Sequence, residues 1–577
     1  MLHFTSWFKY IFYFLFFILF SCSTYDVREQ KQLRLMLENH EFENALSFIN
    51  ESSLAKNKRD QLLFYFEKGN VFYTKGDYQS ALDVWTNAHE ILIQRYTKVS
   101  QKVLGVLAHE SNEDFFGYPY EISALYYLST LACYQLYLSN SKKNHSSLAR
   151  NYLFKARSYL LSWDNYLKSL NLDNEFKYIY FDDYYARFFA AQIHELIGGQ
   201  TDLEISLNLY EDSYNLFLLQ GRTFRQFESQ FDAKIAETLS SLKDKDSWKE
   251  KTKKLQLDSL KYNNAEFVAT KEFIIESILN IVSKIRPNEL AKYEKKYFFK
   301  KPKNKVTKNV VFLLHSGIVP EKLGETVNLS LSSVSKDSSA SSKVLAIVAN
   351  AGFLVFAHKT LGLGGVSVSS GGGSSFDWYQ TNSLLKLSGD VGAALAYEVP
   401  TVDKNINREN WFLEISDNRG QIIESHKPFQ LVSSFGEWNF QTVMAERAQR
   451  IVSKGARFVT KHVIAMMGAY ALYQSIDIAS RSQNAQGNYG DGGSALAKFA
   501  AISSYLASAK LIELSEKADL RSWSTLPKDV FQIRTKLQKG EYKIWLVSKN
   551  DPNSKIDFGV ISVNDNEALQ IFPLQKI

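Results

Sequence analysis

One stretch of the chain, LLFYFEKGNVFYTKGDYQSALDVWTNAHEIL at residues 62–92, restricts the fold more than any other. Its apolar residues recur at helical spacing on both sides of a turn at Gly76, which predicts two helices that fold back on each other. Gly69 and Ala81 stand where these helices would approach closely, and Trp85 would fill the adjacent space. A helix pair of this kind buries its apolar face by stacking against further pairs.

The spacing resembles the tetratricopeptide (TPR) repeat, a helix–turn–helix unit of about 34 residues. Lys68 stands where that repeat usually has Leu, and the final Pro is missing. Weaker copies at EFENALSFI, at residues 149–156 and at SLNLYEDSYNLF raise the number of predicted pairs to four. The signature residues of the clearest copy are Tyr65, Gly69, Phe72, Gly76, Tyr78, Ala81, Trp85 and Ala88.

We therefore predict a TPR-like α-solenoid over residues 22–220. Solenoids offer extended concave surfaces, and this one would bind envelope proteins or peptide segments in its groove. For any single aromatic residue of the array, packing between repeats is the alternative to partner binding.

An apolar run precedes the array and ends at a cysteine. The run from Tyr10 to Phe20 has 11 residues, a length typical of the apolar region within a signal peptide and too short to span a bilayer. Leu19 and Ser21 before Cys22 resemble the lipobox of bacterial lipoproteins, although Phe20 departs from the usual small or β-branched residue at its place. The resemblance predicts a signal peptide at residues 1–21 and lipidation of Cys22, with fatty acyl chains such as palmitate as the membrane anchor. An ordinary secretory signal or an uncleaved anchor helix is the alternative.

The residue after Cys22 is Ser23 rather than Asp, which by resemblance to enterobacterial sorting favours the outer membrane. The predicted location is thus the cell envelope, with the chain anchored by lipid and facing the periplasm. Cys133 would be the one remaining thiol, because the chain has 2 cysteines. An intramolecular disulfide is then excluded, and the apolar surroundings of Cys133 predict a small buried hydrophobe.

The pattern changes from helical to strand-like at Asn309. Residues 221–300 predict further helices, and the basic run KKYFFKKPKNKVTKN at 295–309 predicts a linker, with contact to anionic lipid as the alternative. Residues 301–577 predict a β-rich, sandwich-like domain, in which WFLEISDNRGQIIESH forms a hairpin. DVFQIRTKL and EYKIWLV are expected to pair with each other across Lys539-Gly540.

Two Ala-rich segments at about 437–517 predict a helical hairpin inserted between the strands of this domain, and an amphipathic membrane insertion is the alternative. The apolar stretch 344–357 is too short to span a membrane, and the Gly/Ser-rich stretch 362–378 predicts a loop. The fold class predicted for the whole chain is α + β multidomain: a TPR-like α-solenoid followed by the β-rich domain.

The outline resembles an uncharacterised family of bacterial envelope lipoproteins. The resemblance is carried by the repeat at Gly69–Ala88, by VVFLLHSGIVPEK, and above all by Ala518–Trp523 with Thr525–Pro527. Only the last of these motifs is distinctive. The resemblance implies the architecture and the company of envelope proteins, including peptidoglycan-synthase activators, and it implies no activity.

Motifs that carry catalysis or ligand binding are missing from the sequence. The net charge of +7 over 577 residues does not argue for nucleic acid, and no zinc-finger or aromatic RNA-binding motif is present. The sequence contains no H-E-x-x-H, no G-x-S-x-G and no phosphate-binding glycine loop. We therefore predict no catalytic residue, no metal and no cofactor. Arg521 and Trp523 are candidates for docking a partner, with a structural role as the alternative.

The predicted function is a non-enzymatic outer-membrane lipoprotein that serves as a protein-binding scaffold. One alternative is an enzyme acting on peptidoglycan or polysaccharide, or a regulator of such an enzyme, with a site in the β-rich domain. Another is a structural subunit of a secretion or motility machine.

Overall fold

The computed structural model describes most of the helical and strand regions. The described residues are 27–96, 114–142, 146–172, 180, 182–221, 264–298, 308–328, 396–403, 408–444, 516–549, 551, 554–564 and 569–576, with single positions between 450 and 513. The predicted signal peptide, Cys22, and the stretches 344–357 and 362–378 lie outside them. The fold is α+β, with helices in the N-terminal part and strands in the C-terminal part, as predicted.

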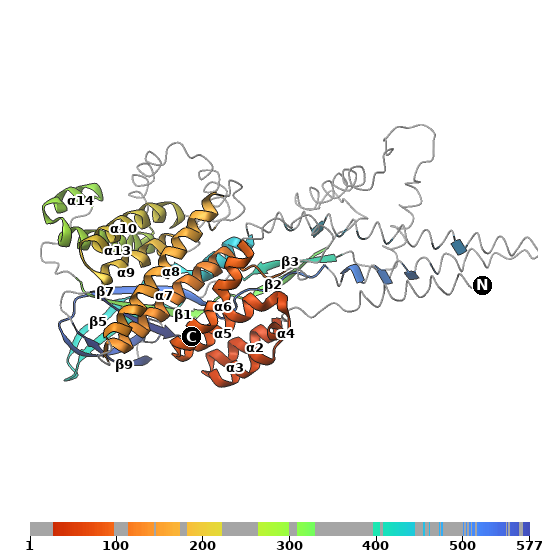
Figure 1. The fold of residues 1–577 in the computed structure, drawn as a ribbon, viewed down its shortest axis with the longest axis horizontal. Helices are drawn as coiled ribbons and strands as arrows, with labels where there is room; N and C mark the ends of the chain where they lie inside the picture. Colours follow the sequence, from red (N-terminus) through yellow and green to blue (C-terminus); the bar gives the residue numbers. More distant parts are fainter. Residues whose placement is uncertain are drawn as a thin grey trace, which may run out of the picture.

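The helices follow one another in antiparallel pairs (Figure 1). Their bounds are α2 (Val27–Glu38), α3 (Phe42–Glu51), α4 (Ser53–Lys56), η1 (Lys58–Asp60), α5 (Gln61–Lys75), α6 (Tyr78–Tyr96), α7 (Pro119–Lys142), α8 (Ser146–Leu172), α9 (Tyr184–Ile197), α10 (Gln200–Gln220), α13 (Ala265–Ile285), η4 (Pro287–Glu289) and α14 (Leu290–Lys296).

The helix pair predicted over residues 62–92 is present as α5 and α6. Gly76 ends α5 in the left-handed conformation at φ 88°, and its N–H bonds to the carbonyls of the last turn. A Cβ placed on Gly69 would lie 2.2 Å from Nε1 of Trp85. The two helices therefore approach closely because residue 69 has no side chain.

Successive pairs lie beside one another. Tyr152 of α8 donates to Gln79 of α6 at 2.8 Å, and the rings of Tyr159 and His89 are 5.0 Å apart. The two contacts advance in the same direction along both helices, so the second helices of neighbouring pairs run parallel.

The strands form three sheets. A four-stranded sheet, here the central sheet, has the order β10-β1-β7-β6, and a second, here the outer sheet, has the order β5-β4-β8-β9. β2 and β3 form a two-stranded ribbon. The bounds are β1 (Val310–Ile318), β2 (Lys322–Asn328), β3 (Ala396–Val402), β4 (Trp411–Asp417), β5 (Ile422–Pro428), β6 (Gln430–Ser434), β7 (Pro527–Thr535), β8 (Gly540–Ser548), β9 (Lys555–Val563) and β10 (Gln570–Lys576).

The predicted hairpin is confirmed as β4 and β5, which pair antiparallel around a turn at Gly420. The predicted pairing of DVFQIRTKL with EYKIWLV is wrong. The first segment is β7, which lies between β1 and β6, and the second is β8, which lies between β4 and β9. β7 is buried along most of its length, which suits an interior strand of a covered sheet.

The central sheet lies between the helices and the outer sheet. Val311 and Leu313 of β1 belong to the hydrophobic cluster of the helices, whereas Phe312 and Leu314 belong to a cluster shared with the outer sheet. Burial on both faces explains the unbroken apolar run of β1. In Figure 1, α7 and α9 lie over β1 and β7, in agreement with the contacts of Tyr127 with His315 and of Gln192 with Gln532.

The described positions between 450 and 513 are mostly helical, in agreement with the predicted helical insertion. Phe458 and Ile512 of this insertion pack with Tyr397 and Val399 of β3. Lys454 donates to the carbonyls of Glu398 and Lys517 at 3.2 and 3.1 Å. Of the helices that the structure describes, none combines the length and apolar character needed to cross a membrane.

Candidate functional site

Residues 519–525, DLRSWST, run between the N-terminal helices and the start of the ribbon. We call them the DLRSWST segment. Buried polar side chains of the helices hold it from one side, and Lys322 of β2 donates to the carbonyl of Arg521 at 3.3 Å. The segment leads directly into β7. Arg521 of this segment is buried together with its partner Asp60.

Arg521 forms the centre of an ion-pair network. Its Nη1 lies 2.7 Å from Oδ1 of Asp60, and its Nε and Nη2 lie 2.9 and 2.7 Å from the carboxylate of Asp519. Burial raises the pKa of Asp60, although Arg521 opposes this shift. Burial by itself would raise the pKa of Asp519, but the hydrogen bonds and positive charge of Arg521 outweigh burial and lower the pKa of that carboxyl. The guanidinium thus stabilises Asp519 more strongly than Asp60.

Trp523 packs into the helical core. Its ring stacks on Phe66 with 4.5 Å between centroids and meets Trp85 edge-on at 6.3 Å. The exposed fraction is 1% for Trp523 and 3% for Arg521. Their contacts lie within the chain, which supports a structural role for both residues rather than docking of a partner.

Two buried glutamates accept hydrogen bonds from this segment. Glu67 of α5 accepts from the N–H and hydroxyl of Ser524 at 2.6 and 2.8 Å, and from the hydroxyl of Thr525. Glu121 of α7 accepts from the N–H of Trp523 at 2.8 Å. Burial raises the pKa of Glu67 to about 7 and also raises the pKa of Glu121. Both carboxyl groups therefore serve as partners for backbone donors.

The backbone carbonyls of the segment are also satisfied by helix side chains. Asn70 of α5 donates to the carbonyl of Thr525 at 2.7 Å, and Arg34 of α2 donates to that of Ser524 at 3.1 Å. Gln30 donates to the carbonyl of Leu520 at 3.3 Å. Because buried backbone groups need partners, these side chains replace the neighbouring strand that the segment lacks.

The first helices of the other pairs contact the central sheet in the same way. Tyr127 of α7 shares a 2.8 Å hydrogen bond with Nε2 of His315 on β1. Tyr134 accepts from the N–H of Ile571 on β10 at 3.0 Å. Glu195 of α9 pairs with buried Arg534 on β7. The face formed by the first helices is thus covered by the chain's own sheet.

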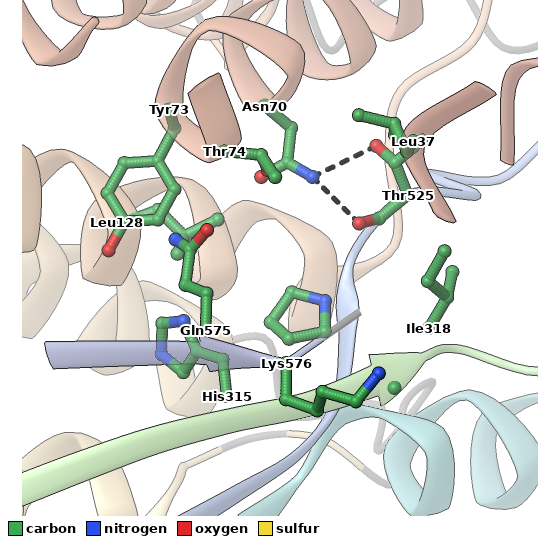
Figure 2. Close-up of a pocket in the computed structure, with 12 residues that line it drawn as sticks. Leu37, Asn70, Tyr73, Thr74, Leu128, His315, Ile318, Thr525, Gln575 and Lys576 are labelled. Carbon is green, nitrogen blue, oxygen red and sulfur yellow. Dashed lines mark hydrogen bonds between the residues drawn. The ribbon is translucent and has the colours of Figure 1, made fainter. Parts of the chain in front are cut away.

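A small cavity lies beside the segment (Figure 2). Its volume is about 30 Å³, and no carboxylate lines it. Space of this size holds on the order of two water molecules. The lining residues are Leu37, Asn70, Tyr73, Thr74, Leu128, His315, Gly317, Ile318, Thr525, Pro527, Gln575 and Lys576.

The polar groups at this cavity are mostly neutral. Burial lowers the pKa of His315 to about 3 and raises the pKa of Tyr73 well above its ordinary value. The Tyr73 hydroxyl is buried beside Gln575 without a hydrogen bond of good geometry. Such a site suits bound water and contains no activated nucleophile.

Other titratable side chains are also buried in the helical layer. His89 lies between the rings of Tyr126 and Tyr159, and burial lowers its pKa to about 3. Burial raises the pKa of the Cys133 thiol to about 12. Within the described part of the chain, no group of three or more His, Cys, Asp or Glu side chains could hold a metal ion.

The structure brings the TPR signature residues together on α5 and α6. Gly69, Ala81, Trp85 and Ala88 are buried between the helices, Gly76 forms the turn, and Tyr65, Phe72 and Tyr78 are partly buried. Cys22 lies outside the described residues.

Sequence analysis missed the polar side chains that hold the segment. Glu67 and Asn70 interrupt the buried face of α5 at helical spacing, and polar residues on an apolar face are the signal that could have indicated them. Their partners lie more than 450 positions away, at 457 and 455 residues.

These contacts define an α+β protein whose helical layer and central sheet form one core. No family model, curated protein or solved structure matches the chain.

Proposed function

We propose that the protein is a non-enzymatic scaffold of the cell envelope, anchored through lipid on Cys22 and facing the periplasm from the outer membrane. Its helical array acts as a TPR-like solenoid, and its two four-stranded sheets act as a sandwich. The observation that carries the proposal is the joining of helices and sheet by buried pairs such as Arg521–Asp60 and Arg534–Glu195. Because these pairs fix the helices to the sheet, they favour a rigid body whose surface binds partner proteins.

The parallel order of α6 and α8 supports the solenoid part of the proposal. In stacked repeats, each pair contacts its neighbours, and equivalent helices lie side by side. The contacts Gln79–Tyr152 and His89–Tyr159 fit that order. Because the first helices cover the central sheet, partners would bind at the second helices, on the outside of the array.

The buried acids do not favour the enzymatic alternative. A pair of carboxylates with raised pKa is typical of acid–base catalysis. Glu67 and Glu121, however, accept hydrogen bonds from backbone N–H groups, and neither lines the cavity beside them. Their raised pKa is explained by burial at a structural joint.

The anchoring step is tested by replacing Cys22 with Ser in cells that make the full chain. We expect the variant to leave the membrane fraction or to retain its signal peptide, as mass spectrometry of the mature N-terminus would report. Cys133→Ser is the matched control, since Cys133 is buried and should not affect anchoring. Unchanged processing and anchoring of Cys22→Ser would refute the proposed lipidation.

The scaffold role is tested by crosslinking in intact cells, followed by isolation of the complexes. We expect one or a few envelope proteins to be recovered reproducibly and in defined stoichiometry. Recovery of none would refute the role. A large fixed assembly would instead indicate a structural subunit of a machine.

A further inference from the structure

The outward face of α8 carries exposed apolar side chains. The exposed fraction is 55% for Phe154 and 63% for Leu161. Arg150, Phe154, Arg157 and Leu161 recur at spacings of four, three and four residues, which places them on one side of the helix. Ser158 lies on the same side between the two apolar residues and is also exposed.

The opposite face of α8 accounts for the packing of this helix within the chain. Ala156, Leu160, Trp163 and Leu167 are buried in the helical core. The exposed Phe154 and Leu161 are therefore not needed to hold α8 in place. Exposed apolar side chains grouped on one helix face are typical of an interaction surface.

The charge of this face is positive. α8 contains Arg150, Lys155, Arg157 and Lys168, and its one acidic residue, Asp164, is engaged by Lys168 and Arg187. Arg157 lies 3.8 Å from Asp202, a long and half-exposed pair. Arg150 makes no ion pair with the residues that the structure describes. The apolar residues thus stand between basic side chains that an acidic partner would complement.

We propose that this face, defined by Arg150, Phe154, Arg157 and Leu161, docks an acidic amphipathic helix of a partner protein. The inference rests on the scaffold function and names its docking site. Phe154 and Leu161 are seven residues apart, so they lie about 10.5 Å apart along the axis. A partner helix with apolar residues at the same interval and carboxylates beside them matches both features.

A lipid surface is a poorer match for this face. α2 begins five residues after the proposed anchor Cys22, so its start lies within about 18 Å of the lipid attachment. The pair α5/α6 separates this end of the molecule from α8. The anchor therefore brings α2, rather than α8, close to the bilayer.

The test places a photo-crosslinking amino acid at Ser158 of the full, anchored chain in cells. Mass spectrometry of the crosslinked peptide identifies its composition. We expect a peptide of another envelope protein with acidic residues around apolar ones. Crosslinking should fall about tenfold or more in Phe154→Ser/Leu161→Ser and in Arg150→Glu/Arg157→Glu. Ile422→Ser is the matched control, because Ile422 is 55% exposed on β5, and it should leave crosslinking unchanged.

Other results overturn the proposal. Crosslinks to lipid, to a second copy of this chain, or to residues 222–263 of the same chain would each assign the face to another occupant. An unchanged yield after charge reversal would exclude an acidic partner. If isolation of complexes recovers a partner while Ser158 crosslinks to nothing, the scaffold function holds and this docking site fails.

Discussion

Arg521 and Asp60 form a buried ion pair with 2.7 Å between Nη1 and Oδ1, although they are 461 positions apart in the chain. The pair joins the loop before β7 to the short helix before α5. A buried charge retained at such a joint needs its counter-charge, because transfer of a lone ion from water is strongly unfavourable. The ion pair gives Arg521 a structural role within the DLRSWST segment, so this distinctive motif does not require a ligand.

Replacing Arg521 with Ala should destabilise the protein by about 3–5 kcal/mol, since it leaves the carboxylates of Asp60 and Asp519 without their partner. Urea unfolding followed by circular dichroism measures this loss. Lys75→Ala removes the exposed partner of Glu43 and should leave the free energy of unfolding almost unchanged, because exposed ion pairs are screened by water and salt. Equal effects of the two substitutions would contradict the structural role of Arg521.

Replacing Gly69 with Ala should destabilise the α5/α6 pair. The added methyl group would overlap the Trp85 indole, and overpacking of this kind costs about 1–3 kcal/mol or more. Thermal unfolding measures the change. Trp85→Leu should recover part of the loss when combined with Gly69→Ala, whereas simple addition of the two losses would place the strain elsewhere.

Glu67 should make the folded state less stable as pH rises from about 4.5 to about 7. The folded protein keeps the proton of Glu67 up to about 7, whereas the unfolded chain releases it near 4.5. The free energy of unfolding of Glu67→Gln relative to the wild type should therefore increase across this window. Unfolding in urea at several pH values measures the difference, with exposed Glu43→Gln as control. A constant difference would mean that Glu67 is ionised when folded.

His315 should make the folded state less stable as pH falls below about 6.5, which is the opposite direction to Glu67. The unfolded chain binds a proton near pH 6.5, and the folded protein does so only near 3. The wild type should therefore lose more stability than His315→Gln as pH falls from 6.5 to 3, with a slope approaching about 1.4 kcal/mol per pH unit. His40→Asn, at an exposed histidine, is the control. Parallel curves for wild type and His315→Gln would rule out the neutral buried imidazole.

The thiol of Cys133 should be unreactive in the folded protein. Burial blocks access and raises its pKa to about 12, so little thiolate exists at neutral pH. In the Cys22→Ser chain, an aromatic disulfide reagent should detect one thiol only after unfolding in urea. Rapid labelling under native conditions would show that α7 opens on the time scale of the assay.

The local parts of the fold could be predicted from the sequence. The α5/α6 turn at Gly76 and the hairpin at Gly420 each depend on a few adjacent residues. The partners of β7 and β8 could not, because strand pairing depends on contacts between distant segments and both strands show similar apolar patterns. Lys539-Gly540 suggested a hairpin where the chain crosses between two sheets.

Only one part of the candidate site could be predicted from the sequence, because the rest depends on contacts between distant segments. Arg521 and Trp523 stood out as a polar and aromatic pair within a distinctive motif. Nothing near them in the sequence indicates Glu67, Asn70 or Glu121, since these belong to helices with their own periodicity. Only the fold brings both groups together.

The position of β10 has a consequence for how the chain is made. β10 lies beside β1, and its Ile571 is tied to Tyr134, which is 437 positions earlier. During synthesis, α7 emerges long before the sheet that covers it can be completed. Until β10 is made, the apolar face of the helical layer stays exposed to solvent. Because exposed apolar surface promotes aggregation, the nascent protein should depend on a chaperone for most of its translation.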